Sequence, residues 1–159
     1  MHLILADVAL NNDHDLTAAR THAEICLTTH PNDPGALYYL GMAEKMNGDV
    51  KGAIQSLSKS VNANPRNADA QGALGALSLQ AGDVAGAVRA LEQAVQLAPD
   101  EAQNHYELAL GYSRLGEAEK ARAQLQLYSQ LKAKQAADAK NPKRPSTSET
   151  PHMAIGSHP

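Results

Sequence analysis

The stretch "QAGDVAGAVRALEQAVQLAPD", residues 80–100, decides the fold because an earlier part of the chain nearly repeats it. Residues 46–66, "MNGDVKGAIQSLSKSVNANPR", carry Gly-Asp-Val, then Gly-Ala, then a ladder of aliphatic residues and a proline in the same register. The two stretches lie 34 residues apart. Such a period indicates a repeat architecture, in which each unit buries its apolar face only by stacking on its neighbours.

The same period extends to many further positions. A fainter copy comes first, with Asp15, Ala19 and Pro31 in register and His14 where glycine stands later. The period is therefore a property of most of the chain and no accident of composition. The residues in phase across the later copies are Pro31, Pro65 and Pro99; Gly48, Gly82 and Gly116; Asp49, Asp83 and Glu117; Ala53, Ala87 and Ala121; and Leu57, Leu91 and Leu125.

Each copy predicts a helix, a tight turn and a second helix. Asp33 is placed to cap the first helix, with Pro34 at the first helical position, where a missing N–H costs nothing. Gly48 is suited to end that helix in a left-handed conformation, and Asp49 to cap the next. The small residues Gly41, Gly75 and Ala109 stand opposite Ala53, Ala87 and Ala121, which predicts that the paired helices cross closely.

At these positions the sequence resembles the tetratricopeptide repeat (TPR) family, with an Ala- and Gln-rich style similar to bacterial members. Its departures fall mostly at the family's aromatic positions, in keeping with a chain that has no Phe and no Trp. The resemblance implies an all-α fold, a right-handed α-solenoid of helix-turn-helix repeats with a long C-terminal helix. The family pattern is carried by Leu37, Leu40, Gly41, Glu44, Ala53, Leu57, Ser60 and Pro65; by Gln71, Leu74, Gly75, Ser78, Ala87, Leu91, Ala94 and Pro99; and by His105, Leu108, Ala109, Tyr112, Ala121, Leu125 and Tyr128.

We expect two regions in the chain. The first is a TPR array over residues 1–139, and the second is a disordered tail rich in Pro, Ser and Thr over residues 140–159, which holds too little apolar surface to offset the entropy of ordering. Helices are expected near 1–11, 15–29 and 117–139. The array comprises a degenerate or truncated repeat at 1–31, repeats at 34–65, 68–99 and 102–133, and a helical extension to 139.

Bulk properties exclude several classes of function. A net charge of −3 and a pI near 6.1 argue against nucleic-acid binding, which needs a concentrated basic face. No apolar run is long enough for a membrane span, and the first residues lack the pattern of a signal peptide. The chain as given is therefore predicted to be soluble and cytoplasmic, with an upstream targeting segment left open.

The candidate reactive residues do not form a catalytic pattern. His14, His22 and His30 recur every eight residues, a spacing that rotates each away from the helical face of the last. Cys26 occupies a packing position and is expected to be buried and inert, and His105 has no sequence neighbour suited to pair with it. We therefore expect no enzyme activity, no metal site and no cofactor.

The resemblance implies that the first helices of successive repeats line a concave surface that holds a peptide segment or a helix of a partner protein. One subgroup of the family clamps acidic C-terminal tails through Lys, Asn and Arg, but those positions here hold Tyr38, Met42, Ala73, Gln103 and Glu107, so that activity is rejected. A mostly apolar groove for protein–protein interaction remains. The predicted groove residues are Tyr38, Met42, Lys45, Met46, Asp69, Leu79, Gln103, Tyr106 and Leu110.

Two alternatives to an adaptor of this kind stay open. The N-terminal end of the array could stack on a second copy of the chain, which would make it a self-association module. The array could also be an accessory region of a larger protein with enzymatic activity elsewhere. The identity of the partner does not follow from the sequence under any of these hypotheses.

Overall fold

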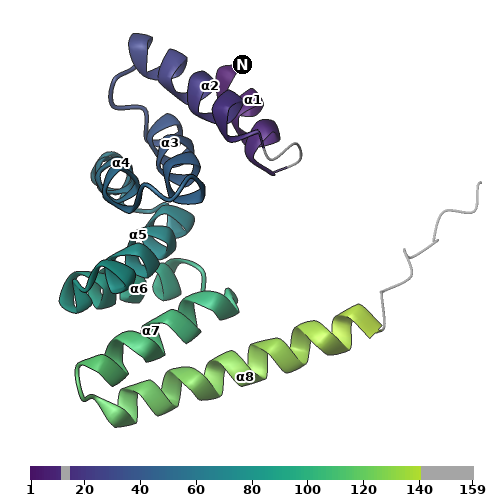
Figure 1. The fold of residues 1–159 in the computed structure, drawn as a ribbon. Coiled ribbons are helices and arrows are strands. Elements are labelled where there is room, and N and C mark those ends of the chain that lie inside the picture. The colour runs from purple at the N-terminus through teal and green to yellow at the C-terminus, as the bar shows by residue number, and fades with distance from the viewer. Residues whose placement is uncertain (12–14, 141–159) are drawn as a thin grey trace, which may run out of the picture.

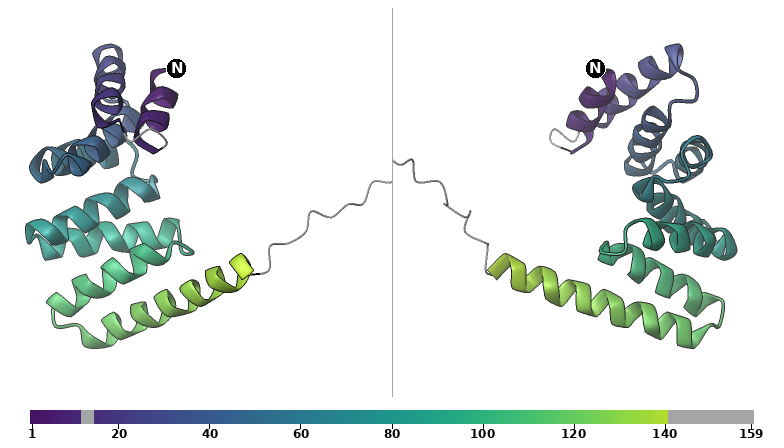
Figure 2. Two further views of the ribbon diagram at one scale, coloured as in Figure 1. Left: turned by 45° about the vertical axis from the view of Figure 1, so that its right-hand side comes forward. Right: turned by 180° about the vertical axis from the view of Figure 1, so that it is seen from behind.

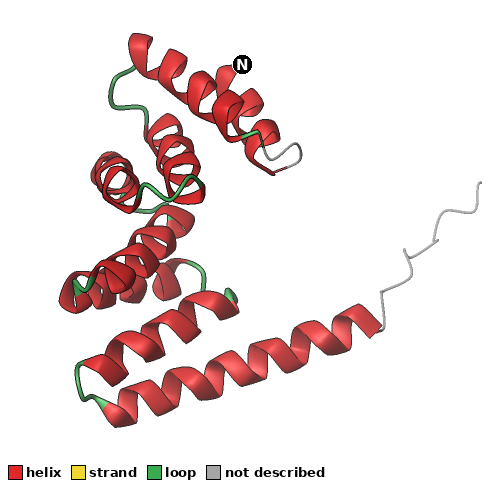
Figure 3. Cartoon of the chain, in the orientation of Figure 1, coloured by secondary structure: helices red, strands yellow, loops and turns green. Residues whose placement is uncertain are grey.

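A computed structural model describes residues 1–11 and 15–140, and every regular element in them is an α-helix. Figure 3 shows helices joined by short loops, and the predicted all-α fold is confirmed. The predicted tail lies outside the described residues, apart from Lys140, which ends the last helix one residue beyond the expected boundary. The helices are α1 (His2–Asn11), α2 (Leu16–Thr29), α3 (Pro34–Met46), α4 (Val50–Ala63), α5 (Ala68–Ala81), α6 (Val84–Leu97), α7 (Ala102–Arg114) and α8 (Ala118–Lys140).

The turns within the hairpins follow the repeat. Gly48, Gly82 and Gly116 have φ values of 83°, 90° and 79°, a left-handed conformation that glycine adopts without a steric penalty. Each precedes the second helix of its pair. The prolines of the same period, at 31, 65 and 99, lie in the connections that lead from one hairpin to the next. Equivalent corners of the fold are therefore built from equivalent residues.

Aspartates cap several helix starts as predicted. The carboxylate of Asp33 accepts a hydrogen bond from the Ala36 N–H at 2.7 Å, and that of Asp49 from the Gly52 N–H at 3.0 Å. Asp83 holds the start of α6 in the same way. Each cap satisfies one of the amide donors that a helix leaves without an intrahelical acceptor.

The helices of a pair cross closely at glycine. A Cβ atom added at Gly41 would lie 2.8 Å from Leu57 Cγ, and one added at Gly75 would lie 2.5 Å from Leu91 Cγ. Both distances are shorter than side-chain packing allows. The predicted close crossing is therefore present, and the leucine of the second helix, which the prediction did not name, lies nearest to the glycine of the first.

The hairpins stack in chain order into a curved array (Figure 1). Contacts between hairpins join α2 to α3, α4 to α5 and α6 to α7, and they also join the odd-numbered helices α1 to α3 and α5 to α7. The odd-numbered helices therefore form the inner layer of the curve. Figure 2 shows α8 running back along α7 and extending beyond it. Because α8 has 23 residues and α7 has 13, and a helix rises 1.5 Å per residue, α8 is longer by about 15 Å.

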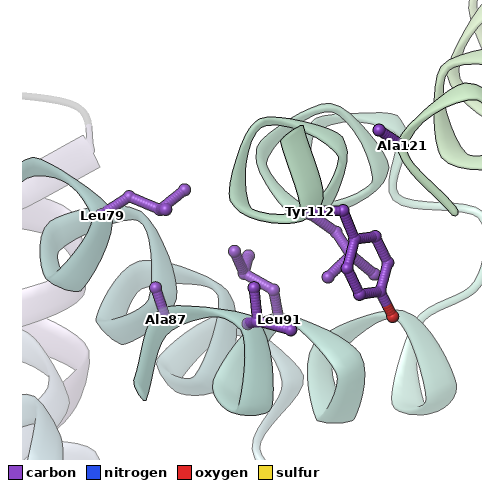
Figure 4. Packing of buried hydrophobic residues seen from close by; sticks show 7 residues of the cluster. Leu79, Ala87, Leu91, Tyr112 and Ala121 are labelled. Carbon is purple, nitrogen blue, oxygen red and sulfur yellow. The ribbon is translucent and has the colours of Figure 1, made fainter. Parts of the chain in front are cut away.

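The core is a chain of small clusters rather than one centre. One cluster joins Leu79, Ala87 and Leu91 to Tyr112 and Ala121, so it spans the last two hairpins (Figure 4). A second surrounds Leu57, and a third links Leu10 and Ala19 to Ala43. This arrangement is what a stack of units predicts, since each helix pair is completed by its neighbours.

Polar residues at the family's aromatic positions have a structural role. The side chain of Gln71 donates to the carbonyl of Pro65, and the ring of His105, one repeat later, lies 2.9 Å from the carbonyl of Pro99. Both therefore bind the same point of the preceding connection. The departures from the family pattern at these positions are explained by a repeated hydrogen bond.

Candidate functional site: a groove along the inner helices

Two adjoining hollows lie on the face formed by α3, α5 and α7. The first, which we call the Tyr38 hollow, has a volume of about 260 Å³, and the second, the Leu110 hollow, about 400 Å³. They share Lys45, Ala76 and Glu107, so together they form one groove across three helices. The Tyr38 hollow is lined by Tyr38, Met42, Lys45, Asp69, Gly72, Ala73, Ala76, Glu101, Gln103, Asn104 and Glu107, and the Leu110 hollow by Lys45, Ala76, Leu77, Leu79, Gln80, Glu107, Leu110 and Arg114.

Seven of the nine predicted groove residues line these hollows. The inner helices bring them together because their repeat positions are equivalent and the helices lie side by side. One of the seven, Leu79, is only 3% exposed and belongs mainly to the core cluster around Leu91. The seven are Tyr38, Met42, Lys45, Asp69, Leu79, Gln103 and Leu110.

Met46 and Tyr106 line neither hollow. Met46 stands in the last turn of α3 and remains 46% exposed. The ring of Tyr106 packs on that of Tyr128 in α8, with the ring centroids 5.3 Å apart. Tyr38 has no such contact with the second helix of its hairpin, because the position equivalent to Tyr128 holds Ser60 there; its ring contacts that of Tyr39.

The groove carries carboxylates without cationic partners. The ion pairs among the described residues join Arg20 to Glu24, Lys120 to Glu117 and Arg122 to Glu119, all outside the groove. Asp69 and Glu101 are exposed, and neither takes part in these pairs. The Tyr38 hollow therefore has an acidic lining that is only partly offset by Lys45.

The tyrosine and arginine of the groove are constrained by their surroundings. Burial raises the pKa of Tyr38 above its usual value, and the negative charges of Asp69 and Asp7 raise it further. Its hydroxyl consequently stays protonated at neutral pH. Arg114 donates from Nη1 to the carbonyl of Leu79 at 2.6 Å, which fixes the guanidinium against the wall of the Leu110 hollow.

Asn104 is a groove residue that the sequence did not reveal as one. It stands where the preceding repeats have Ala36 and Ala70, and it lies against Gly72, where the equivalent positions hold Tyr38 and Tyr106. A Cβ atom at Gly72 would collide with the Asn104 amide oxygen. The sequence did contain a signal for this contact, since Gly72 and Asn104 each differ from the residues at the equivalent positions of the other repeats.

The candidate reactive residues have different environments. His105 is buried, and its ring nitrogens lie within hydrogen-bond distance of the Gln124 side chain and the carbonyl of Pro99. These contacts give His105 a structural role in the fold. Cys26 is half-buried, whereas a buried thiol was predicted. His14 lies outside the described residues, and the described residues contain no group of three or more His, Cys, Asp or Glu side chains arranged to hold a metal ion. Nor is any described helix both long and apolar enough to cross a membrane.

Comparison with solved structures finds similar folds. A structure of MamA superimposes with a TM-score of 0.74 at 22% identity, covering 86% of this chain and 79% of that one. The double mutant of MamA from RS-1 gives 0.73 at 26% identity, with 86% and 76% covered. A Thermobaculum terrenum O-GlcNAc transferase mutant gives 0.64 at 25%, covering 70% of this chain but 21% of that enzyme, so the fold also occurs within enzymes.

Sequence comparison identifies the family. No curated protein sequence matches the chain. The family model for the tetratricopeptide repeat matches residues 3–68 and 47–102, which together cover more than half of the chain. These matches span the helices from α1 to α6, which include the hairpins that turn at Gly48 and Gly82. The chain belongs to the tetratricopeptide repeat family.

Proposed function

We propose that this protein is a non-catalytic scaffold or adaptor that binds a segment of a partner protein in the groove along α3, α5 and α7. The observation that carries the proposal is the groove itself, an open surface whose lining combines apolar side chains such as Ala76 and Leu110 with the carboxylates of Asp69, Glu101 and Glu107. Side chains such as Met42 and Tyr38 suit a protein ligand, because methionine adapts its shape and tyrosine combines apolar area with a polar tip.

The shape of the groove also favours a protein ligand over a small molecule. Small-molecule sites are usually enclosed and surround most of the ligand. The two hollows here are shallow and run across three helices, with exposed side chains such as Asp69 and Leu110 along them. Such a surface matches an elongated segment that makes many modest contacts.

The test uses peptides selected from a displayed random library on the immobilised full-length protein. The affinity of a selected peptide is then measured for the wild type, for Tyr38→Ala and for Leu110→Ala. Loss of one well-packed apolar contact should weaken binding about tenfold, while the helical circular dichroism stays nearly unchanged. Leu127→Ala is the matched control, since Leu127 is 41% exposed and Leu110 36%, but Leu127 lies on α8 outside the groove.

Binding that is insensitive to Tyr38→Ala and Leu110→Ala would refute a groove function. A library that yields no peptide above background would count against it as well. Equal loss of binding and of helicity in Leu110→Ala would assign that residue to packing of the array.

A second candidate function is self-association through the N-terminal hairpin. Ile4 is 69% exposed, Leu5 41% and Ile25 40%, so this hairpin presents apolar side chains from both of its helices. Sedimentation over a range of concentrations tests this candidate. A species that stays monomeric at high concentration, and in which Ile4→Ser changes nothing, would exclude it.

A further inference from the structure

Two histidines from different helices meet at the end of the N-terminal hairpin that lies away from its loop. His2 stands in the first turn of α1 and His22 in the middle of α2, and their Nδ1 atoms are 3.4 Å apart. The ring centroids are 5.6 Å apart, and the ring planes differ by 32°. Spacing along one helix gives His14, His22 and His30 no common face, so this pair arises only because α1 packs against α2.

The distance between the two Nδ1 atoms suits a shared metal ion better than a hydrogen bond. Hydrogen bonds from N–H groups usually have donor–acceptor distances of about 2.7–3.2 Å, so a separation of 3.4 Å makes a weak one. Two imidazole nitrogens bound to one Zn²⁺ at a tetrahedral angle lie about 3.3 Å apart, because each Zn–N bond is about 2.0 Å long. The two helices therefore already hold both nitrogens at the separation that one ion requires.

The repeat register shows that the fold does not need a histidine at either position. At the position of His2 the next two repeats have Ala36 and Ala70, both 0% exposed, in helices that pack on the preceding hairpin. No described helix precedes α1, and His2 is exposed while His22 is half-buried. At the position of His22 a later repeat has Ala90. The pair is thus accessible to an ion, and alanine can replace each member without harm to the packing.

The chemistry of the two ligands indicates which ions the pair can bind. Neutral imidazole is a good ligand for Zn²⁺, Ni²⁺ and Cu²⁺, whereas Ca²⁺ and Mg²⁺ prefer oxygen ligands. No third His, Cys, Asp or Glu side chain completes a metal-binding group with these histidines in residues 1–11 and 15–140. Structural zinc sites usually have four protein ligands. With two, the remaining coordination positions are left to water or to a second copy of the chain, and we expect an exchangeable ion.

We propose that the Nδ1 atoms of His2 and His22 bind one exchangeable divalent ion such as Zn²⁺, and that this ion fastens the start of α1 to α2. The apolar cluster of Leu10 and Ala19 holds the hairpin together near its loop, so the ion acts at the opposite end. An ion that binds only when the two helices are packed together stabilises that packed state. The site is independent of the proposed groove function, since no residue of α1 or α2 lines either hollow.

The first experiment measures Zn²⁺ binding by isothermal titration calorimetry to the full-length chain, prepared without a histidine tag and freed of metal with a chelator. His2→Ala and His22→Ala should each weaken binding at least about tenfold. The double variant should lose little more than either single variant, because one remaining imidazole no longer chelates the ion. His30→Ala is the matched control, since His30 is an exposed histidine at the end of α2 whose Nδ1 lies 2.9 Å from the Thr29 hydroxyl. Equal Zn²⁺ affinity in the wild type and the double variant would overturn the proposal, as would a wild type that binds no Zn²⁺.

The second experiment tests whether the ion joins the two helices. Excess Zn²⁺ should slow amide hydrogen exchange in α1 of the wild type and of His30→Ala, but not of His2→Ala or His22→Ala. Circular dichroism should show that every variant folds like the wild type without metal. Zn²⁺ binding that leaves exchange in α1 unchanged would overturn the fastening of α1 to α2. One ion per two chains, with a dimer in sedimentation that the double variant does not form, would support the site and assign the remaining ligands to a second copy.

Discussion

The second and third full repeats carry leucine at the same repeat position, yet the two side chains have different environments. Leu91 in α6 is 0% exposed, whereas Leu125 in α8 is 43% exposed. Leu57, one repeat earlier, is also 0% exposed. The difference comes from the next helix along the chain, since α5 covers α4 and α7 covers α6, while within the described residues no helix covers α8.

This comparison shows that a residue's burial in a helical stack depends on the next helix as well as on its own sequence. Ala121 in α8 is still only 7% exposed because it faces α7 within its own hairpin. The face of α8 that packs on α7 is therefore covered. The face that would contact a further hairpin is exposed in the described part of the chain. Stability should be distributed accordingly along the array.

The largest expected effect tests the two leucines directly. Leu91→Ala should lower the free energy of unfolding by about 3 kcal/mol, since it removes a fully buried side chain and leaves a cavity. Leu125→Ala should cost about 1 kcal/mol, because part of that side chain already contacts water and no closed cavity forms. Urea unfolding followed by circular dichroism gives both values. Equal losses would mean that α8 is covered in solution.

A somewhat smaller effect is expected at the helix crossings. Gly75→Leu should destabilise the array by about 2 kcal/mol, because the new side chain meets Leu91 at a crossing that is closed on every side. Ala109→Leu is the matched change in the last hairpin. By the repeat register it faces Leu125, which can move toward solvent, so we expect a loss of less than about 1 kcal/mol. A larger loss for Ala109→Leu than for Gly75→Leu would contradict this account.

Most of the fold could be predicted from the sequence because its determinants are local and repeated. The capping carboxylates of Asp33 and Asp49 and the left-handed glycine at 48 act within one hairpin, so the 34-residue register carries them from copy to copy. The contact between Gly75 and Leu91 is similarly set inside a single unit. Caps, turns and crossings could accordingly be predicted well.

The groove was predicted less completely, since its details depend on which side chains differ from one repeat to the next. Tyr106 has the repeat position of Tyr38, but its ring packs on that of Tyr128 in the same hairpin, where the earlier repeats have Ser60 and Ala94. In the sequence, Gly72 and Asn104 are two separate differences from the other repeats. The structure relates them, because Asn104 of α7 occupies the space next to Gly72 of α5. A prediction that treats every repeat as the same unit does not detect a contact between two residues that each occur in one repeat only.

The smallest effect concerns Tyr112, on the covered side of the last hairpin. Burial, followed by a 2.6 Å hydrogen bond from its hydroxyl to Glu92 Oε1, raises the pKa of Tyr112 to about 12. In the unfolded chain the pKa is about 10. The neutral form is thus favoured by folding, so this contribution is complete below about pH 10 and is lost as the pH rises through about 12.

Tyr112→Phe should therefore flatten the decline of stability between about pH 10 and 12, because it keeps the ring but removes the ionisable hydroxyl. Urea unfolding at several alkaline pH values measures this slope for the variant and the wild type. Tyr39, whose pKa is also raised to about 12 by burial and by its hydrogen bond to Asp7, remains in both proteins, so some alkaline decline must persist. Parallel slopes would mean that Glu92 and Tyr112 separate in solution, and that the junction of α6 with α7 is as loosely held as the uncovered face of α8.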